Sequence, residues 1–159
     1  MSDRECLDKI RSSMKIVISY RKKDRLPMEF IYHELVRQGV QPFYDDLLVP
    51  GEYDYYEISS QYRQAGKFGA VILLLSGKSL EPLNYQMRIE YPMAVRFGAD
   101  IIPVWIDKIP WEVVEYEIYN SYPGLSSCKI IDGEGDISRV PAKIIKALED
   151  LCDHIPTDL

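Results

Sequence analysis

One continuous apolar run limits the folds open to this chain. Residues 68 to 76, FGAVILLLS, carry no charged side chain and are too few for a helix of typical globular length, so they predict a strand. A strand without polar alternation is buried on both of its faces, which is typical of a parallel sheet with helices on each side. The run therefore predicts an α/β fold.

Strand and helix patterns alternate along the rest of the chain. Further strands are predicted over 14–20, 40–44, 99–107 and 128–132, and helices over 27–39, 53–65, 83–95, 111–118 and 138–151. Strands joined through helices form right-handed βαβ crossovers. We therefore predict a flavodoxin-like doubly wound sheet of about five parallel strands in the order 2-1-3-4-5, with helices on both faces. Pro42 favours an edge position for the strand over 40–44.

The length of the chain predicts a single domain. Its 159 residues are enough for one sizeable core and too few for two ordinary domains. We predict a helical or frayed leader over 1–13, one domain over 14–153 and a tail over 154–159.

Charge and hydropathy exclude several classes of partner. The net charge is -6, and the longest basic run is RKK at 21–23, which argues against binding a nucleic-acid backbone. No apolar stretch approaches the roughly 18 residues that a membrane span needs, and the first residues lack the apolar core of a signal peptide. These features predict a cytoplasmic protein that binds neither nucleic acid nor membrane.

The cysteines and histidines predict no metal site. Cys6, Cys128 and Cys152 are odd in number and widely spaced, which favours reduced thiols over a disulfide framework. His33 and His154 lie far apart in the sequence, without the spacing of metal ligands. We also expect no resident cofactor.

A ligand site in an open α/β sheet is expected at the carboxyl ends of the strands, beside the switch point of the connections. The segments predicted to emerge there are SYRKKDR, DDLLVPGEY, SGKSLEPLNYQ and the start of the helix that carries Glu90. None of them contains a Rossmann glycine motif or a P-loop, and the chain has no G-x-S-x-G elbow. The basic residues after the first strand also differ from the acidic cluster of a phosphorelay receiver.

Four motifs, in order and at compatible spacing, resemble a Toll/interleukin-1 receptor (TIR) domain over roughly residues 14–151. IVISYRKKDR is similar to the first box of the family, and GVQPFYDDLLVPGEYDYYEI to its second strand and BB loop. AVILLLSGKSL is similar to the third strand, and RIEYPMAVRFGADIIPVWID to the following helix and fourth strand.

The resemblance implies a catalytic residue. In the branch of the family that cleaves NAD⁺, a glutamate near the start of the third helix is catalytic, and Glu90 lies at that position. The family commonly has a tryptophan four residues earlier, where this chain has Gln86, with Tyr85 or Tyr91 able to supply an aromatic face. Pro92 is also uncommon there, because it removes a backbone donor and can kink the helix.

The same resemblance implies residues that contact the substrate. Tyr20, Arg21 and Lys22 match the first box, and Arg21 is expected to pair with the diphosphate, assisted by Lys22. Asp45 matches the acidic position before the BB loop, and Tyr53 an aromatic residue that borders the base. Gln86 completes the predicted substrate-binding set.

Structural roles are the alternatives for these residues. Glu90 could be a surface or helix-dipole carboxylate, and Arg21 and Lys22 could form a solvated turn. Helix packing is the alternative for Tyr53, Tyr55 and Tyr56. Asp45 and Asp46 could simply form the loop. Ser19 and Ser76 could be ordinary hydroxyls at strand ends.

Three functions follow from this reading. The first is a TIR-domain NAD⁺ hydrolase or cyclase similar to stand-alone members of Thoeris-type antiphage systems, releasing nicotinamide and ADP-ribose or a cyclic isomer as a signal for a separate effector. Such a protein is expected to self-associate, because a neighbouring protomer often completes the site. The alternatives are a non-catalytic TIR–TIR interaction module and another flavodoxin-like nucleotide binder, such as a flavin protein.

Overall fold

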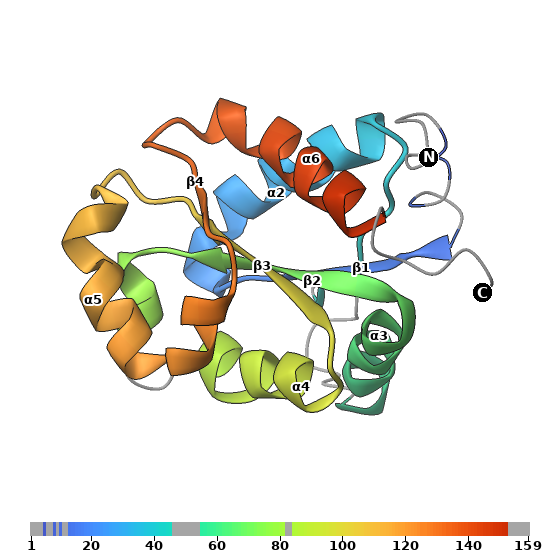
Figure 1. Cartoon of the computed structure of the whole chain (residues 1–159), viewed down its shortest axis with the longest axis horizontal. Helices are drawn as coiled ribbons and strands as arrows, with labels where there is room; N and C mark the ends of the chain where they lie inside the picture. The colour runs from blue at the N-terminus through green and yellow to red at the C-terminus, as the bar shows by residue number, and fades with distance from the viewer. Residues whose placement is uncertain are drawn as a thin grey trace.

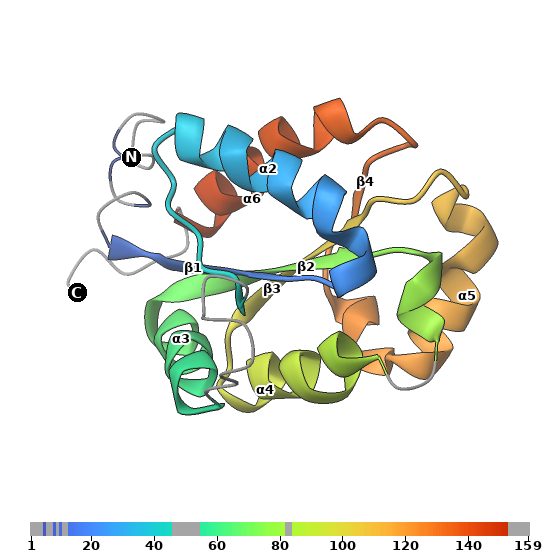
Figure 2. The same ribbon diagram turned by 180° about the vertical axis from the view of Figure 1, so that it is seen from behind.

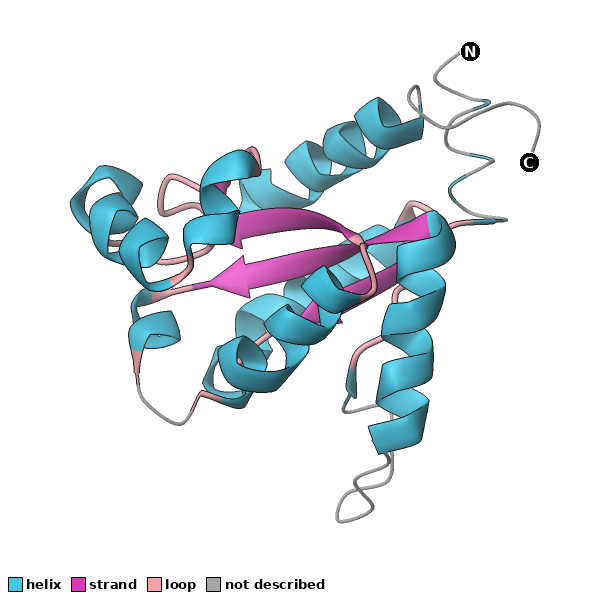
Figure 3. Cartoon of the chain, turned by 60° about the horizontal axis from the view of Figure 1, so that its bottom comes forward, coloured by secondary structure: helices cyan, strands magenta, loops and turns pink. Residues whose placement is uncertain are grey.

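Four parallel strands form the sheet at the centre of the computed structural model. They are β1 (Lys15–Ser19), β2 (Gly69–Leu75), β3 (Asp100–Trp105) and β4 (Ile131–Asp132), in the spatial order β1-β2-β3-β4. All strands run in one direction, so their carboxyl ends share one edge of the sheet (Figure 3). The structure describes residues 14–45, 55–81 and 84–152, together with residues 5, 8, 10 and 13.

The predicted strand over 40–44 is reduced to a single bridge. Phe43 pairs with Val17, donating its N–H to Ile16 O at 2.9 Å and accepting from Ile18 N at 2.8 Å. Pro42, which has no N–H, directly precedes the bridge, so the pairing does not extend toward the amino end. Phe43 lies on the outer side of β1, where the order 2-1-3-4-5 places the second strand. The predicted topology is therefore confirmed, with a one-residue bridge in place of the second strand.

The central strand β2 is buried on both faces, as its apolar sequence predicts. Residues 70 to 75 are fully enclosed. Alternate side chains enter different clusters: Ala70, Ile72 and Leu74 pack on one face, and Val71, Leu73 and Leu75 on the other. At the start of β2, a Cβ on Gly69 would lie 1.9 Å from Lys15 O, so only glycine permits this register with β1.

Helices α2 to α6 cover the two faces of the sheet (Figures 1 and 2). α2 (Arg25–Arg37) and α6 (Val140–Cys152) pack on the Ile72 face. α3 (Tyr55–Phe68), α4 (Tyr91–Arg96) and α5 (Trp111–Ser121) pack on the other. Within the described residues, no helix is long and apolar enough to cross a bilayer.

Short helical segments connect these elements. Among the described residues, four are 3₁₀ turns: η1 (Lys22–Asp24), η3 (Gly77–Leu80), η5 (Pro123–Ser127) and η6 (Ile137–Arg139). Gly39 has a φ of 88° just after α2, the left-handed conformation that ends a helix at little cost to glycine. Of the predicted leader, the described Ile10 is 1% exposed and belongs to the core, whereas the tail over 154–159 lies outside the described residues.

The helix predicted over 83–95 is present from residue 85, but it is not a regular α-helix throughout. Residues Gln86–Glu90 form a π-helical segment, η4, in which Tyr91 N–H bonds to Gln86 O, and regular α-helix begins only with α4. Pro92 explains the change, because it brings no N–H for the carbonyl four residues earlier and the α-helical ladder cannot run through this point. π-helical turns of this kind occur frequently at functional sites.

Candidate active site

The carboxyl ends of β1 and β2 form the switch point of the fold. The chain leaves β1 toward α2 on one face and leaves β2 toward α4 on the other, so the strand ends border a crevice. Gln86 closes the base of this crevice: its Nε2 donates to Ser19 O at 2.9 Å and to Leu74 O at 2.8 Å. Both partners are carbonyl oxygens, so the amide nitrogen must face them. This buried side chain therefore attaches η4 to both strands.

Glu90 lies at the carboxyl end of β1 and is only 4% exposed. The hydroxyl of Ser19, the last residue of β1, donates to Glu90 Oε1 at 2.8 Å. Burial of a carboxylate is unfavourable unless hydrogen bonds compensate, and a hydroxyl donor to a charged oxygen is among the stronger kinds. Glu90 is therefore not the surface carboxylate of the structural alternative, although it does lie at the start of α4.

A pocket of about 370 Å³ opens beside these strand ends. We call it the switch-point pocket. The described residues that line it come from the end of β1, the segment after Phe43 and the start of η4; they are Tyr20, Arg21, Lys22, Asp45, Tyr85 and Gln86. Five of these six are predicted substrate-binding residues. The sixth predicted residue, Tyr53, lies outside the described part of the chain.

Glu90 is not among the described residues that line the switch-point pocket, but it is linked to one of them through Ser19. It follows Gln86 by four residues on η4, and both side chains bond to Ser19, one to its carbonyl and one to its hydroxyl. Ser19 therefore fixes the predicted catalytic residue relative to the pocket wall.

The aromatic side of the pocket is built into the core. Tyr20 is 4% exposed and packs edge-to-face on Tyr44, with ring centroids 6.2 Å apart, and Tyr44 packs in turn on Tyr32 at 4.9 Å. Edge-to-face contacts hold aromatic rings in a defined orientation. Tyr20 is thus a rigid wall, whereas Tyr85 is 38% exposed at the mouth.

Arg21 is not part of a solvated turn, contrary to the structural alternative. Its Nη1 donates to Lys78 O at 2.6 Å, and its Nη2 lies 2.6 Å from Glu81 Oε2. The Arg21 side chain spans from the pocket to the turn after β2, and these contacts leave it only 15% exposed. Lys22 is exposed, as a solvated turn predicts.

Two strand-end serines have partners that sequence reasoning missed. Ser19 donates to Glu90, and Ser76 donates through Oγ to Asp24 Oδ2 at 2.8 Å, where Asp24 is 7% exposed. Each serine follows an apolar run, so the sequence indicated that both lie at strand ends. Their carboxylate partners are 71 and 52 residues away, so no local pattern pointed to them.

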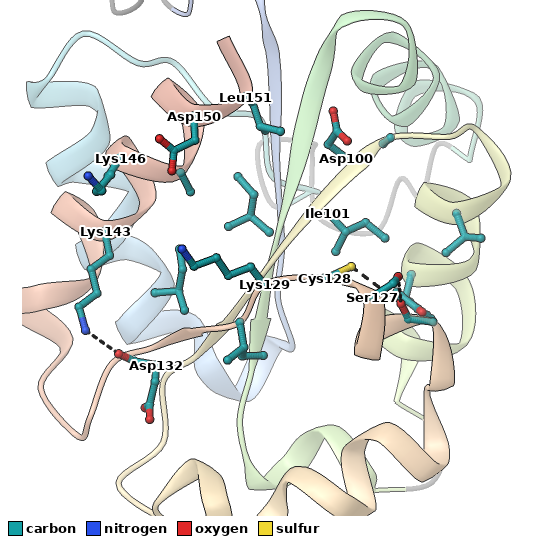
Figure 4. Close-up of a pocket in the computed structure, with 18 of the residues that line it drawn as sticks. Asp100, Ile101, Ser127, Cys128, Lys129, Asp132, Lys143, Lys146, Asp150 and Leu151 are labelled. Carbon is teal, nitrogen blue, oxygen red and sulfur yellow. Dashed lines mark hydrogen bonds between the residues drawn. The ribbon is translucent and has the colours of Figure 1, made fainter. Parts of the chain in front are cut away.

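A second and larger hollow, of about 880 Å³, lies elsewhere on the molecule. We call it the edge groove. β4 pairs with β3 only at Val104 and Trp105, so the amino half of β3 has an open edge. Figure 4 shows Lys143, Lys146 and Asp150 of α6 on one side of this groove and Asp100 and Ile101 of β3 on the other. None of the predicted site residues that the structure describes lines the edge groove, so its size does not make it the candidate active site.

The described part of the chain contains neither a disulfide nor a group of side chains that could bind a metal ion. Cys128 and Cys152 form no disulfide among the described residues, and burial raises the pKa of the Cys128 thiol, which disfavours the reactive thiolate. Across the described ranges, no three His, Cys, Asp or Glu side chains gather in a way that could hold a metal ion.

Comparisons with known proteins agree with the motifs and the topology. A family model described as "TIR domain" matches residues 16–134, whereas no curated protein matches the chain. The fold is also similar to the TIR domains in the structure of the activated Roq1 resistosome directly recognizing the pathogen effector XopQ. That similarity has 14% sequence identity and a TM-score of 0.56, and it covers 90% of this chain and 100% of that one. At this identity the likeness concerns the fold alone. The family match spans most of the chain, and the protein belongs to the TIR domain family.

Proposed function

We propose that the protein cleaves the nicotinamide–ribose bond of NAD⁺ and that Glu90 is the catalytic carboxylate. The observation that carries this proposal is the placement of Glu90. A buried carboxylate, held by the Ser19 hydroxyl, stands at the switch point beside a pocket lined by Tyr20, Arg21 and Gln86. Burial of a charge is costly to the fold, and such groups are concentrated at functional sites.

One carboxylate is sufficient for this reaction. Breaking the bond develops positive charge on the ribosyl ring, much as in glycoside cleavage, and nicotinamide departs as a neutral molecule without needing a proton. A carboxylate about 4 Å from that charge contributes on the order of 4 kcal/mol at an effective dielectric of about 20. An interaction of that size, made only in the transition state, corresponds to roughly a thousandfold in rate.

The pocket offers a place for each part of the substrate. We assign the nicotinamide end to the wall formed by Gln86 and Tyr85, because it is nearest in sequence to Glu90. Arg21 and Lys22 supply cations for the diphosphate. Asp45 and Tyr53 are proposed from the family resemblance to border the adenosine end.

We further propose a biological role from the resemblance to stand-alone bacterial TIR proteins. In it the enzyme acts in the cytoplasm, and its product, ADP-ribose or a cyclic isomer, is an antiphage signal for a separate effector. A cyclase shields the ribosyl intermediate from water and offers it a second nucleophile from adenine, whereas a hydrolase admits water. Self-association through TIR–TIR contacts brings a second protomer to the site.

A non-catalytic interaction module is the rival function. The observation that favours it is the edge groove, whose volume of about 880 Å³ exceeds that of the switch-point pocket. A groove of this size suits the docking of another TIR domain, a function that has no use for a buried carboxylate. The two functions therefore make different demands on Glu90.

Glu90→Gln separates the two functions. We expect it to abolish nicotinamide release from NAD⁺ by the concentrated protein and to leave the sedimentation coefficient unchanged, because the amide keeps the shape but not the charge. Glu117→Gln, which alters an exposed carboxylate on α5, is the matched control and should behave as wild type. Equal nicotinamide release by wild type and the Glu90 variant would exclude the proposed catalytic role.

A further inference from the structure

Arg21 is shared between the switch-point pocket and the turn that follows β2. The residue lines the pocket, yet Nη1 is held by Lys78 O and Nη2 by Glu81 Oε2, both at 2.6 Å. Glu81 is not among the described lining residues of that pocket. Both terminal nitrogens of Arg21 are therefore engaged by the turn over residues 78–81 rather than by the pocket.

Glu81 is the carboxylate at the centre of a small cationic cluster. Besides Arg21, Lys23 Nζ lies 3.7 Å from its Oε2. The hydrogen bond from Arg21, followed by the charges of Arg21, Lys23 and Lys78, lowers the pKa of the Glu81 carboxyl, so it stays ionised at neutral pH. The nearby carboxylate of Asp24 is buried and accepts from Ser76 instead. In a chain with a net charge of -6, Arg21, Lys23 and Lys78 form a local group of cations around Glu81.

We propose that Glu81 is an internal competitor for the anionic part of the ligand, and that a phosphate group binds at the pocket by replacing Glu81 at Arg21 Nη2. A guanidinium group recognises carboxylate and phosphate oxygens with the same planar geometry, so one can substitute for the other. The contact from Nη1 to Lys78 O is compatible with this exchange and keeps Arg21 in place. The assignment of that phosphate to a dinucleotide rests on the proposed function; the competition itself does not.

The exchange is energetically accessible because the pair is exposed on one side. Glu81 is 42% exposed, and ion pairs in contact with water contribute little to stability. A diphosphate group carries at least two negative charges, against one for a carboxylate, and offers more acceptor oxygens. A ligand without phosphate gains nothing from displacing Glu81, so the pair selects for phosphate-bearing ligands.

A double-mutant cycle tests the proposal with inorganic pyrophosphate as the probe. Titration calorimetry at fixed low ionic strength would compare the full wild-type chain with Glu81→Gln, Arg21→Gln and the double variant. Removal of the competitor should tighten pyrophosphate binding roughly fivefold, the upper end of what an exposed ion pair contributes. The same change in the Arg21→Gln background should have almost no effect, because the shared partner is gone.

Glu29→Gln is the matched control. Glu29 also pairs with an arginine, at 2.7 Å from Arg25 Nε, but on α2 and outside the pocket lining. A gain in affinity with Glu81→Gln alone, lost in the Arg21→Gln background, supports the competition. An equal gain with Glu29→Gln would mean a general charge effect and overturn it. No gain with Glu81→Gln, a gain independent of Arg21, or no pyrophosphate binding by any variant would overturn it as well.

Pyrophosphate binding requires no bond cleavage, so the two proposals fail separately. If the double-mutant cycle shows coupling between Glu81 and Arg21 in a protein that does not cleave NAD⁺, the proposed function is excluded and the competition at Arg21 stands. Cleavage of NAD⁺ with no energetic coupling between Glu81 and Arg21 would do the reverse.

Discussion

At the scale of residues, the site depends on two serines that end neighbouring strands. Ser19 and Ser76 are both buried, and each donates its hydroxyl to a buried carboxylate at 2.8 Å. They differ in which carboxylate they hold: Glu90 beside the switch-point pocket, or Asp24 at the start of α2. Substituting Ser76 therefore tests a contact that supports only the fold, whereas substituting Ser19 also tests the support of the proposed catalytic group.

Ser19→Ala should lower kcat for NAD⁺ cleavage, with little change in KM. Hydrogen bonds to charged groups contribute about 1.5–3 kcal/mol, so the loss in kcat should reach about tenfold or more. Ser19→Ala should also lower the free energy of unfolding, so steady-state kinetics and urea unfolding are measured together. Ser76→Ala should lose a similar amount of stability but keep kcat. Ser19→Thr should recover part of the kcat that Ser19→Ala loses. Equal losses of kcat in the Ser19→Ala and Ser76→Ala variants would contradict a specific role for Ser19.

Family motifs predict which residues gather at the site but not how they are held. Tyr20, Arg21, Lys22, Asp45 and Gln86 line one pocket, as a shared substrate site requires, although their binding roles stay predictions. The bond from Ser19 to Glu90 could not be predicted, because it joins residues 71 positions apart and depends on how η4 is seated on the sheet.

At the scale of elements, the π-helical segment η4 sets the relation between Gln86 and Glu90. In this segment Gln86 reaches two strand carbonyls and Glu90 reaches the Ser19 hydroxyl at the same time. Periodicity predicted a helix here but not its type, because apolar spacing barely distinguishes an α-turn from a π-turn over five residues. Pro92 was the available signal, since it removes the donor that a continuous α-helix needs.

Pro92→Ala should reduce activity without reducing stability. The restored N–H lets the α-helix continue through residue 88, which rotates Gln86 relative to Glu90 and disturbs their contacts with Ser19. A displacement of about 1 Å at a reacting group can cost about a hundredfold in rate, so a loss of tenfold or more in kcat is expected. Kinetics with thermal unfolding would measure it, and Pro110→Ala, before α5, is the control. Full activity in Pro92→Ala would mean that the π-turn is not needed.

At the scale of the whole molecule, the apolar sequence of β2 and the alternation of strand and helix patterns together predicted the architecture. A strand buried on both faces requires helices on both sides, and the structure has them. The length of the edge strand could not be predicted, because it depends on a single bridge at Phe43 rather than on local apolar pattern. None of the described residues lines both the switch-point pocket and the edge groove, so the two hollows are separate.

If a second protomer completes the site, specific activity should rise with protein concentration. A monomer that is active alone gives a constant rate per molecule, whereas an assembly-dependent site follows mass action. Initial rates of NAD⁺ loss over a ~100-fold range of protein concentration, with sedimentation in parallel, would measure this. A constant rate per molecule across that range would contradict assembly at the site.

The most direct measurement is identification, by mass spectrometry, of what the concentrated wild-type protein makes from NAD⁺. The account predicts nicotinamide together with ADP-ribose if water attacks, or with a product one water lighter if the ring closes, and neither product from Glu90→Gln. NAD⁺ recovered intact from the wild-type protein, or the same products from the Glu90 variant, would contradict the central claim.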